Sequence, residues 1–262
     1  MPMKPFRFIV LIFICLSAYA ANAGTLVWVT DDTPGGNYII GGGPEFQRKN
    51  PGIEIELYQL VAEILSLDVR LERRPWNMCL HLIEQNKVDG IFPASFKSSR
   101  TKIGTYPMKN GKVDTTRKTR DNGYFLYKLK KDPIHWDGHE FKNVSGLVGI
   151  PLGWSIAEDL KPKYHFIREE TVNRKTPKLL IHKRLQGFVC LETVFDAYLE
   201  KYPNDYGNIE KVKPPIWEKP YYLMLSHKFT RNRPKLAEQI WDTIKAVKQT
   251  KRYSSIVKRY VD

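Results

Sequence analysis

The sequence predicts an α/β protein of two lobes, each with a mostly parallel sheet flanked by helices. Strand-like and helix-like patterns alternate along the chain, and a polar stretch at residues 110–121 divides this alternation into two halves. The length agrees, because about 240 residues beyond an N-terminal leader exceed one average domain of about 100–200 residues.

The N-terminus has the order of a secretory signal peptide. Lys4 and Arg7 precede a short apolar run at residues 8–16, and small residues follow as far as Ala23. The run is shorter than the roughly 20 apolar residues that a membrane-spanning helix needs. We therefore expect residues 1–23 to be cleaved and the mature protein, beginning at Gly24, to be periplasmic.

The first half of the chain has the pattern of a βαβ unit followed by another helix and strand. Residues 26–29 are a short β-rich run, residues 53–65 repeat apolar side chains at helical spacing, and residues 69–72 alternate apolar and charged side chains. A second helix opens at Pro75, and residues 88–92 read as a buried strand. This order predicts a parallel sheet covered by helices.

The second half repeats the alternation. Residues 124–127 are expected to form a strand that carries the chain out of the first lobe, and further elements follow. They are a strand at 147–150, a helix from Ser155, a helix near 178–184, a strand at 188–191, a helix at 193–202, a break at Lys213-Pro214-Pro215, a returning strand at 221–225 and a helix at 234–260. We expect lobe 1 to comprise residues 24–122, lobe 2 with the crossing strands residues 123–215, and the return to lobe 1 residues 216–262.

The formal net charge is +14, and it falls to +12 when the leader is removed, because the leader holds Lys4 and Arg7 and no acid. Such an excess of positive charge has two interpretations. It can produce an electric field that attracts anionic ligands or nucleic acid, or it can simply be a solvated basic surface. The charges are spread along the chain without a nucleic-acid motif, which favours the basic surface and no nucleic-acid partner.

Cysteine and histidine usage gives no metal or cofactor site. After cleavage only Cys79 and Cys190 remain, and they can be bridged or free. Both lie in apolar patterns, which favours buried free thiols, and they are too few for structural zinc. No arrangement of nucleophile, base and acid appears, so the sequence does not predict an enzyme.

Several segments, in the same order along the chain, resemble the type II periplasmic solute-binding proteins of family 3, which include polar amino-acid receptors of ABC transporters. Residues 74–80, then Val88-Asp89-Gly90-Ile91-Phe92-Pro93-Ala94-Ser95 and Arg100, are similar to the family's first lobe. Residues 148–155 and 184–192 resemble two strands of its second lobe.

This resemblance implies a small polar ligand, an amino acid or another carboxylate, that is captured by hinge closure. It also implies a partner in the membrane, either an ABC permease or, for a sensing accessory protein, a receptor, with the protein itself as a monomer. A domain related to cell-wall lytic enzymes, without the catalytic domain, is the remaining alternative.

The resemblance also assigns candidate ligand contacts in the first lobe. Arg100 would hold a ligand carboxylate by two parallel hydrogen bonds, beyond the end of a strand, where ligands bind in open α/β sheets. Its alternative is a surface arginine in a polar turn. Ala94 and Ser95 would contact the ligand through backbone and hydroxyl, Asp32 follows the first strand, and Trp76 is either an apolar wall or a core residue.

In the second lobe the candidates lie at two helix starts. Gly153, Trp154 and Ser155 could meet an anionic group with free backbone N–H groups, although Ser155 can instead simply cap its helix. Glu192 would take the ligand's ammonium group, or be an ordinary acid favoured by the helix dipole. A glycine-rich stretch at residues 41–43 departs from the family pattern, lacks the endings of nucleotide-binding loops, and predicts a surface loop.

Overall fold

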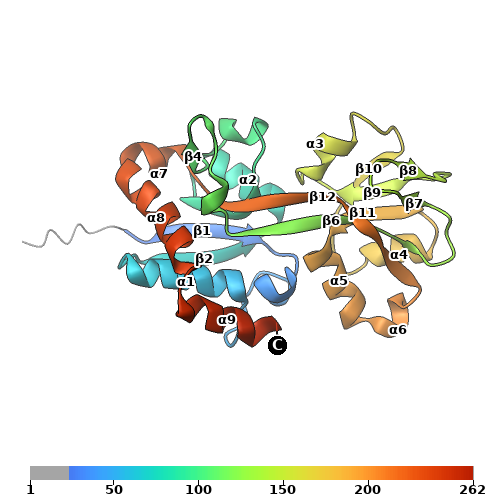
Figure 1. Ribbon diagram of the computed structural model, residues 1–262, viewed down its shortest axis with the longest axis horizontal. Coiled ribbons are helices and arrows are strands. Elements are labelled where there is room, and N and C mark those ends of the chain that lie inside the picture. The colour runs from blue at the N-terminus through green and yellow to red at the C-terminus, as the bar shows by residue number, and fades with distance from the viewer. Residues whose placement is uncertain (1–23, 262) are drawn as a thin grey trace, which may run out of the picture.

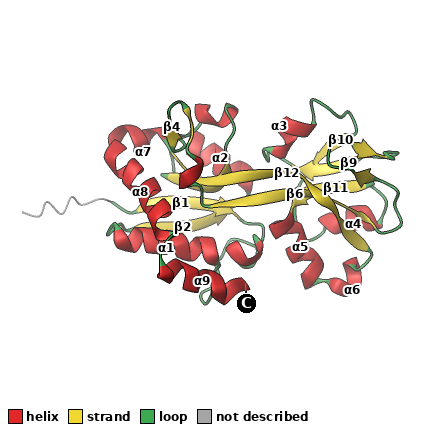
Figure 2. Cartoon of the chain, in the orientation of Figure 1, coloured by secondary structure: helices red, strands yellow, loops and turns green. Residues whose placement is uncertain are grey.

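The computed structural model describes residues 24–261 and contains two lobes side by side (Figure 1). The predicted signal peptide, residues 1–23, lies outside the described residues. One hydrogen-bonded sheet of eight strands runs through both lobes in the order β10-β9-β11-β6-β12-β3-β1-β2. Helices flank this sheet in each lobe (Figure 2). The predicted α/β class is confirmed.

The first lobe has a parallel core of three strands. They are β1 (Leu26–Asp31), β2 (Val69–Arg74) and β3 (Gly90–Ser95), with β1 paired to both others in parallel. The helices of this lobe are α1 (Ile53–Ile64), α2 (Trp76–Glu84), α7 (His227–Asn232), α8 (Pro234–Val247) and α9 (Lys251–Val261). A small hairpin joins β4 (Met108–Lys109) to β5 (Lys112–Val113).

Helices cover both faces of this parallel sheet. Because successive strand residues point to opposite faces, Trp28 packs into the core that includes α1 and α8, whereas Val29 packs into the core that includes α2. Phe92 and Ile91 divide in the same way. Burial on both faces explains why β1 and β3 are largely apolar.

The second lobe is built in the same manner around β9. Its strands are β9 (Val148–Pro151), β10 (Ile167–Glu170) and β11 (Gly187–Leu191), with a hairpin of β7 (His135–Trp136) and β8 (Phe141–Lys142) beside them. Its helices are α3 (Ile156–Leu160), α4 (Thr176–Ile181), α5 (Glu192–Lys201) and α6 (Pro203–Tyr206). β9 pairs in parallel with β10 and β11, while β11 is antiparallel to β6.

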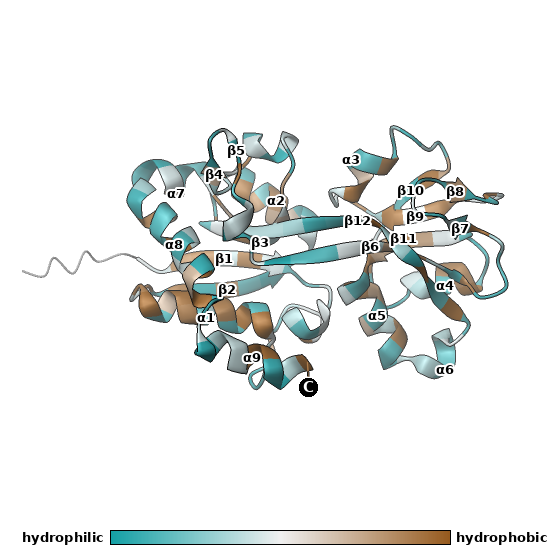
Figure 3. Cartoon of the chain, in the orientation of Figure 1, coloured by the Kyte–Doolittle hydropathy of each residue, from teal (hydrophilic) through white to brown (hydrophobic). Residues whose placement is uncertain are grey.

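Two long strands join the lobes. They are β6 (Arg120–Leu129) and β12 (Ile209–Leu225), antiparallel to each other. Figure 3 shows them largely hydrophilic where they pass between the lobes, in contrast to α1. The predicted break at Lys213-Pro214-Pro215 is wrong, because β12 continues through it. The prolines are accommodated because the pairing of β12 with β6 is interrupted between Val212 and Trp217, where no ladder N–H is needed.

Two further sequence predictions can be compared with the structure. The expected single helix at 234–260 is divided, since α8 ends at Val247 and α9 begins at Lys251. The turn lets Ile256 join the core that contains α1, which one straight helix would not reach. The expectation of free cysteines is confirmed, because Cys79 and Cys190 are both buried and unbridged.

Candidate ligand-binding site

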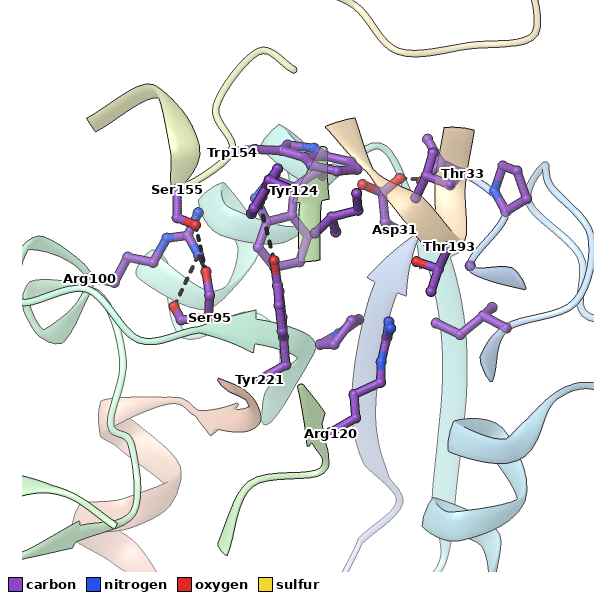
Figure 4. Close-up of a pocket in the computed structure, with 17 residues that line it drawn as sticks. Asp31, Thr33, Ser95, Arg100, Arg120, Tyr124, Trp154, Ser155, Thr193 and Tyr221 are labelled. Atoms are coloured by element: carbon purple, nitrogen blue, oxygen red, sulfur yellow. Dashed lines mark hydrogen bonds between the residues drawn. The ribbon is translucent and has the colours of Figure 1, made fainter. Parts of the chain in front are cut away.

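A small cavity lies between the lobes, at the ends of β1 and β3 and beside the crossing strands (Figure 4). The space open to the centres of water-sized groups is about 50 Å³, so the cavity is suited to a small ligand. Its polar lining residues are Asp31, Thr33, Ser95, Arg100, Arg120, Ser155 and Thr193, and its aromatic ones are Trp76, Tyr124, Trp154 and Tyr221.

Arg100 lies in the short helical turn that follows β3, and its side chain is buried. One terminal nitrogen, Nη1, donates to the carbonyl and hydroxyl of Ser95, each at 3.2 Å, and Nη2 donates to the carbonyl of Gly153 at 3.3 Å. The guanidinium also lies over the Trp76 ring, 5.4 Å from its centroid. Within residues 24–261 no carboxylate forms an ion pair with it.

Polar side chains from both lobes meet beside Arg100. The hydroxyl of Ser95 donates to that of Ser155 at 2.7 Å, which connects the end of β3 to the start of α3. Lys219 of β12 donates to Ser155 at 3.1 Å and forms an ion pair with Asp159, which also pairs with Lys97. Burial lowers the pKa of Lys219 to about 8, although Asp159 opposes this change. This side of the cavity is therefore rich in cations.

Asp31 is the acid that lines the cavity, and it is the last residue of β1. Burial raises the pKa of its carboxyl to about 7, and the neighbouring charge of Asp32 adds to the increase. The backbone N–H of Thr33 donates to the Asp31 carboxylate at 2.8 Å, and this hydrogen bond acts in the opposite direction, lowering the pKa. Near neutral pH this wall of the cavity can therefore present either a charged or a neutral carboxyl group.

The raised pKa of Asp31 gives a testable pH dependence. In the unfolded chain an aspartate loses its proton near pH 4, whereas folded Asp31 keeps its proton up to about pH 7. The folded state thus binds more protons in this interval, so stability should fall as the pH rises from about 4 to about 7. We expect Asp31→Asn to lack this part of the decline.

Thermal midpoints of the wild type and of Asp31→Asn, measured across this interval, test the prediction through their difference at each pH. The variant should gain relative to the wild type as the pH rises. A constant difference between the two proteins would contradict a raised Asp31 pKa.

A buried arginine organises the loop beside Asp31 and explains the glycine-rich stretch. Arg73 of β2 donates to the carbonyl groups of Asp31 at 3.3 Å, Thr33 at 2.7 Å and Gly41 at 2.9 Å. The carbonyl groups turn inward around this guanidinium, and Gly41 has a φ of 73°, a conformation suited to glycine. The loop holds Asp31 and Thr33 in place at the cavity.

Aromatic side chains form the remaining wall. The hydroxyl of Tyr221 donates to that of Tyr124 at 3.2 Å, and the Trp154 ring meets Tyr124 edge-on with centroids 6.4 Å apart. Tyr221 and Tyr124 lie on the two crossing strands, β12 and β6, so both strands contribute to the site. Such a wall can pack against the carbon skeleton of a ligand, while the charged groups orient its polar ends.

The structure brings five of the predicted site residues together at the cavity: Trp76, Ser95, Arg100, Trp154 and Ser155. The other four lie elsewhere. Gly153 contacts Arg100 through its carbonyl, Ala94 is buried behind the lining, and Asp32 lines a separate groove with Gly41 to Gly43. Glu192 begins α5 outside the cavity, where it pairs with Lys211 at 3.2 Å, while its neighbours Leu191 and Thr193 line the cavity.

The sequence interpretation missed several lining residues, among them Asp31, Arg120, Tyr124, Thr193 and Tyr221. A signal for Asp31 was present, since alternation along β1 places it on the face of Val29, toward α2. Arg120, Tyr124 and Tyr221 lie on the crossing strands and had no such signal. They line the cavity only because the two lobes meet beside these strands.

Residues 24–261 contain neither a metal-binding cluster nor a membrane-spanning helix. No group of three or more His, Cys, Asp or Glu side chains there is arranged to hold a metal ion. Among the same residues, no helix combines the length and the apolar character needed to cross a membrane.

Residues 42–262 match the family model of the bacterial extracellular solute-binding proteins, family 3. Among curated proteins, none matches the chain by sequence. Solved structures with a similar fold include the arginine-, lysine-, histidine-binding protein ArtJ from the thermophilic bacterium Geobacillus stearothermophilus. It is 15% identical with a TM-score of 0.69, over 91% of this chain and 95% of that one.

Two other solved structures show that the fold is not confined to one kind of protein. The GluR0 ligand-binding core from Nostoc punctiforme, in complex with L-glutamate, is 17% identical with a TM-score of 0.68, over 90% of this chain and 99% of that one. A histidine kinase sensor domain with similarity to periplasmic binding proteins is 13% identical with a TM-score of 0.70, over 90% and 96%. The predicted type II periplasmic-binding-protein-like fold is confirmed.

Proposed function

Because this chain belongs to family 3 of the bacterial extracellular solute-binding proteins, we propose that it captures a small carboxylate-bearing solute, an amino acid or another organic acid, between its two lobes. The ligand carboxylate binds Arg100, and the aromatic wall packs against the rest of the molecule. The proposal includes export to the periplasm after cleavage of residues 1–23. Binding alone, without turnover, is the activity.

The buried guanidinium of Arg100 is the observation that supports this most strongly. Arg100 is 6% exposed, and its hydrogen-bond acceptors are neutral oxygens of Ser95 and Gly153. A buried charge without a counter-ion is costly, and an anion that reaches it offsets that cost. A carboxylate is suited to the planar fork of an arginine, which can donate two parallel hydrogen bonds to it.

Contacts between the lobes support capture by hinge closure. In addition to the Ser95–Ser155 hydrogen bond, Ser99 donates to the Glu158 carboxylate at 2.9 Å and Lys97 pairs with Asp159. Each of these contacts joins the end of the first lobe's β3 segment to α3 of the second lobe. They form only when the lobes are together, so a ligand that binds both lobes shifts the protein toward this arrangement.

The lobe boundaries and the partner belong to the same proposal. We place lobe 1 at residues 24–122, lobe 2 at 123–215 and the return at 216–262, with hinge motion in β6 and β12. In this proposal the closed, ligand-bound form docks on an ABC permease, or on a membrane receptor if the protein serves sensing. The similar histidine kinase sensor domain has the same fold, so docking on each kind of membrane partner needs a direct test.

Calorimetry on the mature protein, with a panel of small organic acids and amino acids, tests the capture of a carboxylate. Each acid is paired with its amide, which lacks the charge. We expect the acid to bind and the matched amide to bind at least about 10-fold more weakly, because hydrogen bonds to charged groups contribute about 1.5–3 kcal/mol. Equal binding of acid and amide would refute the role of Arg100 in the proposal.

A further inference from the structure

A second buried arginine lines the same cavity. Arg120 begins β6, and its Nε donates to the Glu54 carboxylate at 3.1 Å. Its guanidinium lies over the Tyr38 ring, 4.3 Å from the centroid, and 5.7 Å from that of Tyr221. These contacts fix the plane of the guanidinium, so its remaining N–H groups have set directions.

Within residues 24–261, one nitrogen of the Arg120 guanidinium has N–H groups without an acceptor. Arg120 is only 6% exposed. Among the described residues, its Nη1 is a buried nitrogen without a hydrogen-bond partner. Nη1 is not the nitrogen that meets Glu54, since Nε makes that contact. Figure 4 shows the guanidinium at the end of a side chain that rises toward the space between Tyr221 and Thr193. Nη1 and the nearby Oε1 of Glu54 are both closed off from the cavity, so a ligand meets the part of the Arg120 guanidinium that lines the cavity.

The charges around the cavity favour a second anionic group over a neutral one. Four cationic side chains gather here with two carboxylates that pair with them, apart from Asp31. The cations are Lys97, Arg100, Arg120 and Lys219, and the paired acids are Glu54 and Asp159. With Asp31 protonated the cations exceed the acids by two, which two ligand carboxylates would balance, whereas ionised Asp31 reduces the excess to one. A single ligand carboxylate at Arg100 does not use the donors of Arg120.

We propose that Arg120 forms a second acid-binding subsite, and that the ligand is a compact diacid with one carboxylate on Arg100 and the other on the part of the Arg120 guanidinium that lines the cavity. This inference rests on the proposed function, because it assumes that Arg100 takes the first carboxylate. It goes further by naming the class of ligand and the residue that selects it. In Figure 4, Arg120 and Arg100 lie on opposite sides of Tyr221, and all three line the same cavity, so a diacid alongside this ring would face both guanidinium groups.

Matched pairs of ligands test the inference on the wild-type protein without any substitution. Calorimetry compares glutarate with valerate, and L-glutamate with norvaline, because each pair differs in the second carboxylate. We expect at least one diacid to bind about 10- to 100-fold more tightly than its monoacid partner. If each monoacid binds as tightly as its diacid, the second subsite does not exist, while the carboxylate role of Arg100 stands.

Arg120→Lys then assigns the preference to this residue. Lysine keeps a cation opposite Glu54 but lacks the fixed fork, so the diacid should lose about 10-fold or more in affinity, while the monoacid stays within about 2-fold. Arg117→Lys, which changes a paired arginine of the first lobe outside the cavity, is the control and should alter neither affinity. Parallel losses for diacid and monoacid would overturn the inference. If the wild type bound neither diacid but bound other acids of the panel, the inference would be refuted and the proposed carboxylate capture would stand.

Discussion

Arg100→Met is expected to lower the affinity for a carboxylate ligand by about 100-fold or more, because loss of one member of a buried charge pair costs about 2–5 kcal/mol. Methionine keeps much of the side-chain volume beside Trp76 but has no donor for the ligand. The loss should be specific to acids, and the weaker binding of the matched amide should change little. Calorimetry with an acid and its amide measures both.

The same substitution should leave the ligand-free protein as stable as the wild type, or more stable. The wild type buries the Arg100 charge against neutral oxygens only, and replacing a buried ion with an apolar side chain is often neutral or stabilising. Thermal unfolding without ligand checks this expectation. Arg70→Met is the matched control, since Arg70 is exposed and pairs with Glu72 on the same lobe. An unchanged acid affinity in Arg100→Met would exclude Arg100 from the site.

Gly52→Ala is expected to give the largest loss of stability, by about 3 kcal/mol or more. Gly52 precedes α1 with a φ of 122°, and an added Cβ would lie 2.3 Å from the carbonyl oxygen of Tyr38. Backbone strain of this kind costs about 1–3 kcal/mol, and overpacking against backbone adds a comparable amount. The thermal midpoint should fall by roughly 10 °C.

Gly43→Ala separates backbone strain from the steric clash. Gly43 also has a positive φ, of 96°, but nothing lies within 4 Å of an added Cβ. Its loss of stability should therefore be smaller, about 1 kcal/mol. If both variants unfolded at the same temperature, the contact with Tyr38 would carry no cost. Tyr38 stacks on Arg120, so Gly52→Ala should also weaken diacid binding in the fraction that folds.

Local patterns were enough for most of the secondary structure. The apolar spacing of α1 and the short apolar runs of β1 and β11 depend on near neighbours in the chain, and burial against helices preserves those patterns. The errors occurred where distant contacts override local preference. Pro214 and Pro215 are breaks by their chemistry, yet β12 passes through them because its pairing with β6 is interrupted at that place.

The candidate site shows the same contrast between residues that a local motif identifies and residues that depend on the tertiary structure. Arg100 was identified because an ordered motif on one β-strand and turn carries it, and its position beyond β3 is a local property. Glu192 and Asp32 were placed one residue away from lining positions, because the exact residue at which a strand ends decides which side chain enters the cavity. Sequence pattern leaves that end uncertain by a residue or more.

The amino-acid sequence by itself determined the α/β class, the family and the place of Arg100 just beyond β3, since each depends on residues close together in the chain. Only the tertiary structure decided which groups share the cavity with Arg100. Asp31, Arg120 and Tyr221 come from segments far apart in sequence, and the ends of both lobes and two crossing strands must meet before they form one site. The unpartnered nitrogen of Arg120 is a result of that packing, because a donor becomes costly only when the fold removes it from water.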